Sequence, residues 1–188
     1  DNILAINATL NDLVGICSND RGDIFVADIH TNYSDPLIYI SRSRIVKIDA
    51  TGVFTTLFFS PQDQYFRIED LAIYSDGSLL FSDSNRIRMM YDNGTIFTIA
   101  GGSNGYSGDD GPATSAGLDY PRGLTVMNNG HIVFADVGNR RIRKFSIGGN
   151  ITLVGGTGGS DFSGRSGIAL SSIIIGVDEE QFMTENDS

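Results

Sequence analysis

Carboxylates and arginines recur at a regular spacing in this chain of 188 residues. Three aspartates each end an apolar run and follow a glycine by six residues: Asp28, Asp83 and Asp136. An arginine followed by isoleucine opens the next run in each copy: Arg44, Arg86 and Arg141. A carboxylate at a strand end can accept backbone N–H groups of the following turn and can pair with an arginine beyond it. Because the set occurs once in each copy, it predicts a structural role and not a unique active site.

Other residue types that could do chemistry are sparse. The two histidines, His30 and His131, cannot form a three-histidine zinc site within this chain. Residues 109–111 (Asp-Asp-Gly), with Asp119 near them in sequence, could offer oxygens to calcium. Calcium needs six to eight oxygens, however, and no DxDxDG spacing supplies them. Cys17 falls at a small inner-strand position that predicts packing. No phosphate-binding loop with GK[ST] is present, and we predict no catalytic residue, no metal and no cofactor.

The elements that position these residues follow one period. The aspartates are 55 and 53 residues apart, in the range of a four-stranded propeller blade. In the stretch 101–156, four apolar runs are separated by NNG, DVGNR and GG, which are typical turn residues. The runs are 124–126, 132–135, 142–145 and 151–154. This pattern predicts an antiparallel four-stranded meander.

These motifs resemble the NHL-repeat family of β-propellers. The motifs are PRGLTV, GHIVFADVGNRRIRK and GNITLVGG in the third copy, with DGSLLFSDSNRIR and GTIFTIAGG in the second. The linker GYSGDDGPATSAGLDYPRG is similar to the connectors of bacterial, protist and teneurin-type NHL arrays. The resemblance implies a propeller, usually of about six blades. It implies no single activity, because members bind RNA, proteins or sugars and a few related propellers are enzymes.

We therefore expect an all-β, NHL-like propeller of four-stranded antiparallel blades, as one domain with three blades and remnants of two more. The expected blades are 13–58, 70–102 and 123–156, and the expected remnants are 1–12 and 168–188. Each blade buries its faces only against its neighbours, so we expect the chain to be part of a larger ring; a ring closed by several chains is the alternative. The frame glycine and the strand-end acid are 13 residues apart from Gly15 to Asp28 and from Gly123 to Asp136. From Gly176 to Glu185 they are only nine residues apart. We expect about four residues to be skipped there, with a degenerate blade as the alternative.

Composition excludes some partners. The formal net charge is −10 and the sequence pI is near 4.4, and the only basic cluster lies within residues 140–144. Alternation along a strand divides that cluster between two faces, so we expect no nucleic acid partner. No apolar run approaches the ~20 residues of a membrane span.

Loop lengths differ between the two ends of the predicted strands. The turns between the first and second strands of a blade, and between its third and fourth strands, are short. The long segments all fall at the opposite end of the strands, and they are 30–43, 60–69, 101–122 and 155–176. Five of the seven tyrosines lie in those long segments, and Tyr is favoured in recognition surfaces. The candidate binding face comprises Tyr33, Tyr39, Tyr65, Phe66, Tyr106 and Tyr120. The alternative is that these rings only hold long loops onto the blades.

Five Asn-x-Ser/Thr sequons favour a secreted protein carrying N-glycans. We expect glycans on Asn32, Asn93, Asn150 and Asn7, and Asn186 is a further sequon. The sequence thus predicts an extracellular, non-enzymatic module that binds a protein partner or self-assembles through the long-loop end. The alternative is an enzyme propeller of the amidating lyase or lactonase type, with catalytic residues in blades that this chain does not contain.

Overall fold

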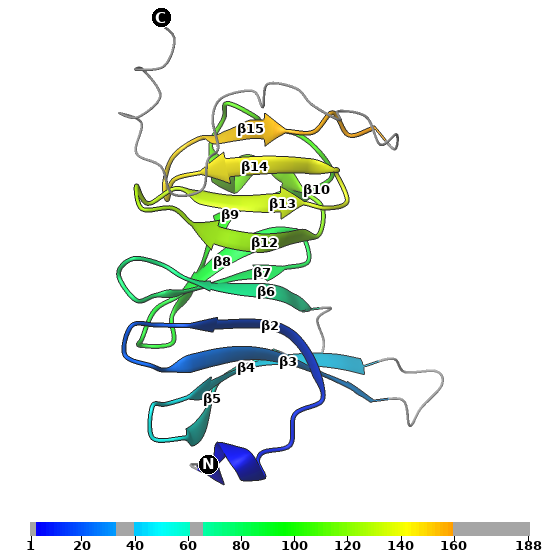
Figure 1. Ribbon diagram of the computed structural model, residues 1–188. Helices are drawn as coiled ribbons and strands as arrows, with labels where there is room; N and C mark the ends of the chain where they lie inside the picture. Colours follow the sequence, from blue (N-terminus) through cyan, green and yellow to red (C-terminus); the bar gives the residue numbers. More distant parts are fainter. Residues whose placement is uncertain (1–2, 33–39, 61–65, 160–188) are drawn as a thin grey trace, which may run out of the picture.

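The computed structural model describes residues 3–32, 40–60 and 66–159 of the chain (Figure 1). The described part is built from β-strands and two short 3-10 turns, and its three large sheets are antiparallel. The prediction of an all-β fold of four-stranded antiparallel blades is confirmed. The expected remnant at 168–188, with its proposed skip after Gly176, lies outside the described residues.

Each blade is a meander in which consecutive strands are neighbours. The first sheet contains β2 (Asp12–Ser18), β3 (Ile24–Asn32), β4 (Ile40–Ile48) and β5 (Val53–Phe59), with the short β1 (Ile3–Leu4) added at the outer edge. The second contains β6 (Ile68–Ile73), β7 (Leu79–Asp83), β8 (Arg86–Met90) and β9 (Ile96–Ala100). The third contains β12 (Pro121–Val126), β13 (Ile132–Asp136), β14 (Arg141–Phe145) and β15 (Ile151–Gly155). The first strands lie side by side, because β6 contacts β2 on one side and β12 on the other (Figure 1).

Strand register shows that the three blades are copies of one frame. The residues opposite the strand-end aspartates are Leu13, Ile68 and Pro121. Every blade has a register shift early in its first strand and another between its third and fourth strands. Equivalent positions can therefore be compared from blade to blade.

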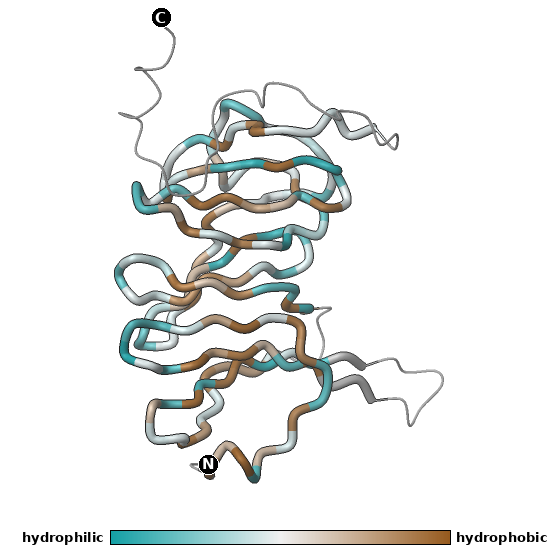
Figure 2. The backbone as a smooth tube through the Cα atoms, in the orientation of Figure 1, coloured by the Kyte–Doolittle hydropathy of each residue, from teal (hydrophilic) through white to brown (hydrophobic). Residues whose placement is uncertain are grey.

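The hydrophobic core lies between the sheets. Phe25, Ile45, Leu71 and Phe81 belong to the cluster that joins blades one and two. A second cluster joins blades two and three and takes in the connector residues Ala113, Ala116 and Leu118. Figure 2 shows the apolar residues running along the strands, while the turns at the strand ends are largely polar.

Equivalent apolar side chains are exposed on the two outermost sheet faces and buried where a neighbouring blade covers them. Ile16, Leu71 and Leu124 occupy equivalent positions of the three first strands, and their exposed fractions are 69%, 3% and 7%. On the opposite sheet face, Ile142 is 46% exposed, whereas its equivalents Ile45 and Ile87 are fully buried. Within the described residues, both end faces are thus apolar surfaces of the kind that is buried at the two junctions.

Two 3-10 turns show that residues 5–10 and residues 113–118 have the same local structure. They are η1 (Ala5–Asn7) and η2 (Ala113–Ser115). The Ala5 N–H donates to the Gly52 carbonyl at 2.8 Å, and the Ala113 N–H donates to the Gly149 carbonyl at 3.0 Å. Both acceptors precede the fourth strand of the following blade, so the two connector ends dock in the same way.

Cys17 lies on β2 and packs against the core between blades one and two. Burial, with a smaller contribution from Asp70, raises the pKa of its thiol from 9.0 to about 12.

At pH 8 the folded chain should therefore hold about 10³-fold less Cys17 thiolate than the unfolded chain. We expect iodoacetamide to alkylate the native protein at least about 100-fold more slowly than the urea-unfolded protein. Equal rates would contradict this placement.

The Cys17 thiol should also make stability depend on pH. Because its pKa is higher in the folded chain than in the unfolded chain, this thiol should leave the free energy of unfolding unchanged below pH 9 and should lower it as the pH rises from there through about 12.

Candidate functional site

The long segments and the short turns lie at opposite ends of the strands. The long-loop face is defined here by residues 84–85, 101–122 and 137–140. The tight-turn face is defined by residues 19–22, 49–52, 74–77, 91–94, 127–130 and 146–149, which are closed by short-range backbone hydrogen bonds. The connector between blades two and three adds β10 (Ser103–Asn104) and β11 (Gly117–Leu118), which pair in parallel on the long-loop face.

The strand-end aspartates hold connectors to blades. Asp28 accepts the Asn11 N–H at 2.9 Å and the Arg44 Nε–H at 2.7 Å. Asp136 accepts the Asp119 N–H at 2.8 Å. The predicted backbone donors were those of the following turn, and that detail is wrong. The donated N–H belongs to the segment that precedes the first strand, because the carboxylate points across the register toward it.

Blade two uses the same carboxylate position differently. Arg88 Nε lies 2.9 Å from Asp83 Oδ2, and the Arg88 guanidinium stacks 5.0 Å from the Phe66 ring centroid. Burial raises the pKa of Asp83, while Arg88 and Arg86 oppose that shift. Phe66, Arg88 and neighbouring polar residues line a cavity of ≈ 240 Å³ on the long-loop face.

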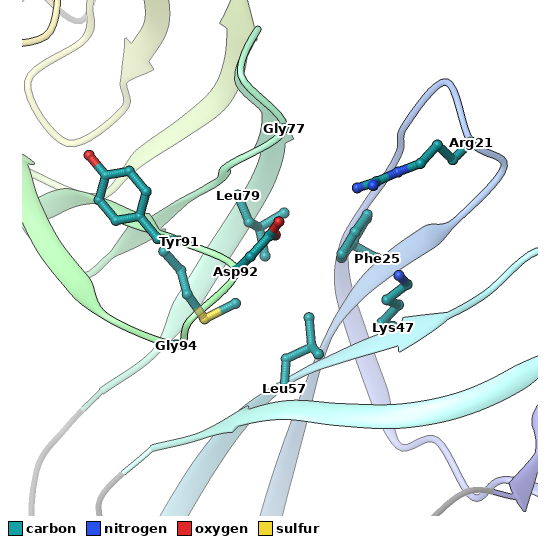
Figure 3. A pocket seen from close by; sticks show the side chains of 10 residues that line it. Arg21, Phe25, Lys47, Leu57, Gly77, Leu79, Tyr91, Asp92 and Gly94 are labelled. Carbon is teal, nitrogen blue, oxygen red and sulfur yellow. The ribbon is translucent and has the colours of Figure 1, made fainter.

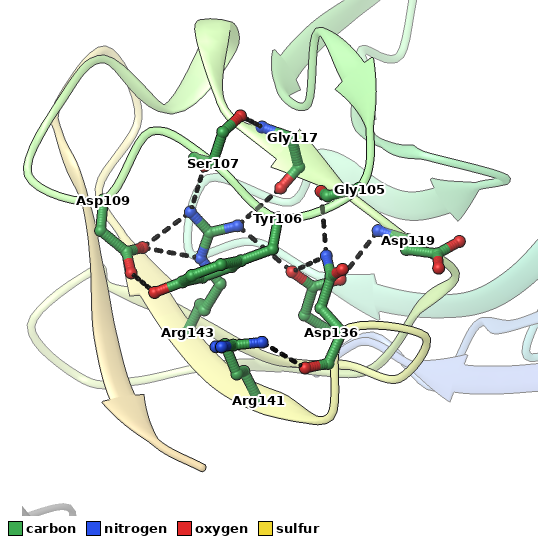
Figure 4. A network of polar contacts seen from close by, with 10 residues as sticks. Gly105, Tyr106, Ser107, Asp109, Gly117, Asp119, Asp136, Arg141 and Arg143 are labelled. Atoms are coloured by element: carbon green, nitrogen blue, oxygen red, sulfur yellow. Dashed lines mark hydrogen bonds and ion pairs between the residues drawn. The ribbon is translucent and has the colours of Figure 1, made fainter. Parts of the chain in front are cut away.

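Arg143 ties the connector between blades two and three to blade three (Figure 4). Its side chain is fully buried. It donates to Asp109 Oδ1 at 2.9 Å, to the Gly117 carbonyl at 2.7 Å and to the Ser107 carbonyl at 2.8 Å. It also donates to Asp136 at 3.2 Å. One guanidinium thus satisfies two carboxylates and two backbone carbonyls, which the planar fork of arginine can do and a single ammonium cannot.

Tyr106 lies over this network and remains accessible. Its ring centroid is 3.6 Å from Arg141 Cζ and 5.2 Å from Arg143 Cζ, so two cations pack against one ring. The Tyr106 hydroxyl donates a hydrogen bond to Asp109 (Figure 4), and this bond raises the pKa of the phenol. The ring is nevertheless 42% exposed. Tyr106 therefore both holds its loop and presents surface.

The other residues of the predicted binding face differ in how exposed they are. Tyr120 is 51% exposed, with a φ of 50° and its N–H donated to the Ser84 carbonyl at 3.1 Å. Phe66 is only 7% exposed, so its assignment to the binding face is wrong. Its ring packs 5.2 Å from that of Phe58 and 6.0 Å from that of Phe81, in the core between blades one and two. Tyr33, Tyr39 and Tyr65 lie outside the described residues.

The predicted glycosylation sites differ in accessibility. Asn7 and Asn93 are exposed. Asn93 Oδ1 accepts the Thr95 N–H at 2.9 Å, whereas Asn150 donates its Nδ2 to the Asp110 carbonyl at 2.8 Å. Asn32 ends β3, and its side chain and all of Asn186 lie outside the described residues.

The surface of the described residues shows neither a group of metal-ligating side chains nor a continuous basic patch. Within residues 3–32, 40–60 and 66–159, no three His, Cys, Asp or Glu side chains are close enough to hold a metal ion. His131 lies on the tight-turn face beside Asn129. Arg143 is buried, so the cluster at 140–144 is not a continuous basic patch. No helix in the described part of the chain is long and apolar enough to cross a membrane.

Comparison with known proteins defines the class of the fold. Residues 118–145 match the NHL repeat family, which confirms the NHL resemblance for the third blade. The fold is similar to that of virginiamycin B lyase from Staphylococcus aureus, with a TM-score of 0.52, 22% identity, and coverage of 82% of this chain and 44% of that chain. It is also similar to an auxiliary nutrient binding protein from Bacteroides thetaiotaomicron, with a TM-score of 0.52, 14% identity, and coverage of 80% and 49%. At these identities the likeness concerns the propeller fold alone.

Among curated proteins, this chain is similar to teneurins. It is 36% identical to human teneurin-4 over 89 residues, which cover 39% of this chain and 3% of that protein. It is 28% identical to chicken teneurin-1 over 174 residues, which cover 84% of this chain and 6% of that protein. The chain therefore spans only a small part of these relatives.

Arg143→Met should destabilise the chain by about 3–5 kcal/mol, because it leaves the buried Asp136 and the partly buried Asp109 without their shared cation. The matched control is Arg140→Met, since Arg140 is exposed and only reaches the Gly158 carbonyl at 3.5 Å. We expect the control to change stability by less than about 0.5 kcal/mol in urea unfolding. Similar losses in the two variants would show that Arg143 does not hold the connector.

Proposed function

We propose that this chain is part of an NHL-type propeller that acts as a non-enzymatic, extracellular protein-interaction or assembly module. Its long-loop face contacts the protein partner or a second copy. The observation that carries the proposal is the construction of the loop around Tyr106. A buried arginine orders the loop backbone, yet the aromatic ring on top of it stays 42% exposed.

An ordered, exposed aromatic residue suits recognition. Tyr provides a large contact area with two rotatable side-chain bonds, and a loop that is already ordered loses little entropy on binding. Tyr120, at the end of the same connector, is 51% exposed. Together the two rings offer anchors of the kind that dominate protein interfaces. The similarity to teneurins supports the NHL-type part of the proposal.

The extracellular assignment rests on the sequons and their surroundings. Asn93 lies in an exposed turn, with its side-chain carbonyl already engaged and its Nδ2 without a partner among the described residues. That arrangement leaves the nitrogen available for a glycan.

The alternative remains an enzyme propeller of the amidating lyase or lactonase type. The lyase neighbour supports it only through a fold shared at 22% identity, and a propeller fold hosts many functions. Catalytic groups would have to come from blades outside this chain. The interaction module is preferred because it uses residues that the described surface presents.

The interaction face can be tested with fluorescently labelled, secreted protein on cell surfaces, and by sedimentation for self-association. Tyr120→Asn removes the exposed ring and keeps a residue type that tolerates positive φ. We expect bound signal or self-association to fall at least about fivefold, as for an interface anchor. The control is Ile147→Asn on the tight-turn face, where Ile147 is 38% exposed, and it should bind normally. Loss only in the control would place the interaction on the other face, and no binding in either assay would overturn the proposal.

Glycosylation can be tested by intact mass after expression in a mammalian secretory system. We expect Asn93 to be glycosylated more completely than Asn150, because Nδ2 of Asn150 already donates to the Asp110 carbonyl. Asn93→Gln should remove one glycan from the mass. A secreted protein with unmodified Asn93 would count against the extracellular assignment.

A further inference from the structure

A cavity opens on the tight-turn face between blades one and two (Figure 3). Its volume is ≈ 320 Å³, near the lower limit for small-molecule sites. Phe25, Leu79 and Met90 form apolar walls and are 8%, 3% and 5% exposed. The cavity lies at the opposite end of the strands from the proposed interaction face.

The rim carries opposite charges on its two sides. Arg21 and Lys47 come from blade one, and Asp92 comes from the last turn of blade two. Lys47 is already paired with Asp23 at 2.9 Å. The Arg21 side chain is 71% exposed and reaches Asp23 only at 3.9 Å. Asp92 has no hydrogen-bond or ion-pair partner among the described residues, and Figure 3 shows its carboxylate facing the gap toward blade one.

The equivalent gap between blades two and three is filled. Tyr74 occupies the position of Asn19, packs against that junction's core, and places its hydroxyl 3.4 Å from the Gly130 carbonyl. Met89 occupies the position of Lys47 and is 1% exposed. The cavity therefore lies where blade one carries Asn19 and Lys47, whereas Tyr74 and Met89 fill the same place at the other described junction.

We propose that this cavity binds a small zwitterion with an apolar side chain, that is, an amino acid of the size of phenylalanine or leucine. The side chain lies against Phe25, Leu79 and Met90. The carboxylate faces Arg21, whose guanidinium has capacity for a further acceptor. The ammonium group faces Asp92. This inference does not depend on the proposed function, because it uses different residues on a different face.

The test is titration of the full chain, observed through the methyl NMR resonances of Met90 and Leu57, another wall residue. The probes are L-phenylalanine, its amide, which lacks the carboxylate, and 3-phenylpropionate, which lacks the ammonium group. We expect saturable shifts with L-phenylalanine and roughly fivefold weaker binding of each analogue, the scale of one partly exposed ion pair.

Exposed charge variants separate binding from folding. Asp92→Asn should weaken L-phenylalanine and the amide but not phenylpropionate, and Arg21→Gln should weaken L-phenylalanine and phenylpropionate but not the amide. The double variant Asn19→Tyr/Lys47→Met, which copies the filled junction, should abolish the shifts. Tyr74→Phe at the other junction is the matched control and should bind normally.

The proposal is overturned if L-phenylalanine gives no saturable shifts at these methyl groups. It is also overturned if the three probes bind equally, or if both charge variants bind all probes as the unaltered chain does. The two charge variants decide the matter even if the double variant does not fold, since both substitutions lie at exposed positions.

Discussion

Each four-stranded sheet is apolar on both faces and can bury them only against neighbouring sheets, and the rest of the structure depends on this constraint. Leu71 and Leu124 are buried because a blade precedes them, whereas the equivalent Ile16 is 69% exposed. Burying a side chain of this size contributes about 1.5–3 kcal/mol. A stack of blades must also return the chain from the fourth strand of one blade to the first strand of the next. These returns all run at one end of the strands, which is why irregular loops gather on one face and short turns on the other.

Irregular backbone near a core needs hydrogen-bond partners, and the three blades meet this need differently at one position. Arg143 is buried in blade three and donates to two connector carbonyls. Its equivalent in blade two is Arg88, which pairs with Asp83 beneath the Phe66 ring. In blade one the position is Val46, which belongs to a hydrophobic cluster that Ala5, Ala8 and Leu10 pack against. The long-loop face can therefore differ from blade to blade while the sheets remain alike.

The same comparison separates structural residues from candidate binding residues. The strand-end aspartates recur in all three described blades, and each accepts a hydrogen bond or forms an ion pair that holds the fold together. The cavity beside Asp92 and the stack on Tyr106 each occur once among the described blades, and both leave polar or aromatic groups accessible. The two features lie on opposite faces, so a partner at one need not interfere with a ligand at the other.

The sequence by itself determined the all-β class, the blade period and the four-stranded antiparallel blade. These depend on local signals, namely turn residues, alternation and the glycine–aspartate spacing. It could not assign Phe66, which looked like an exposed loop aromatic and is buried because the rings of Phe58 and Phe81 lie beside it. Nor could it place the Asn11 N–H against Asp28 or bring Arg21 and Lys47 opposite Asp92. These residues are about 17 to 71 positions apart in the sequence, and only the packing of one sheet against the next decides which side chains lie near one another.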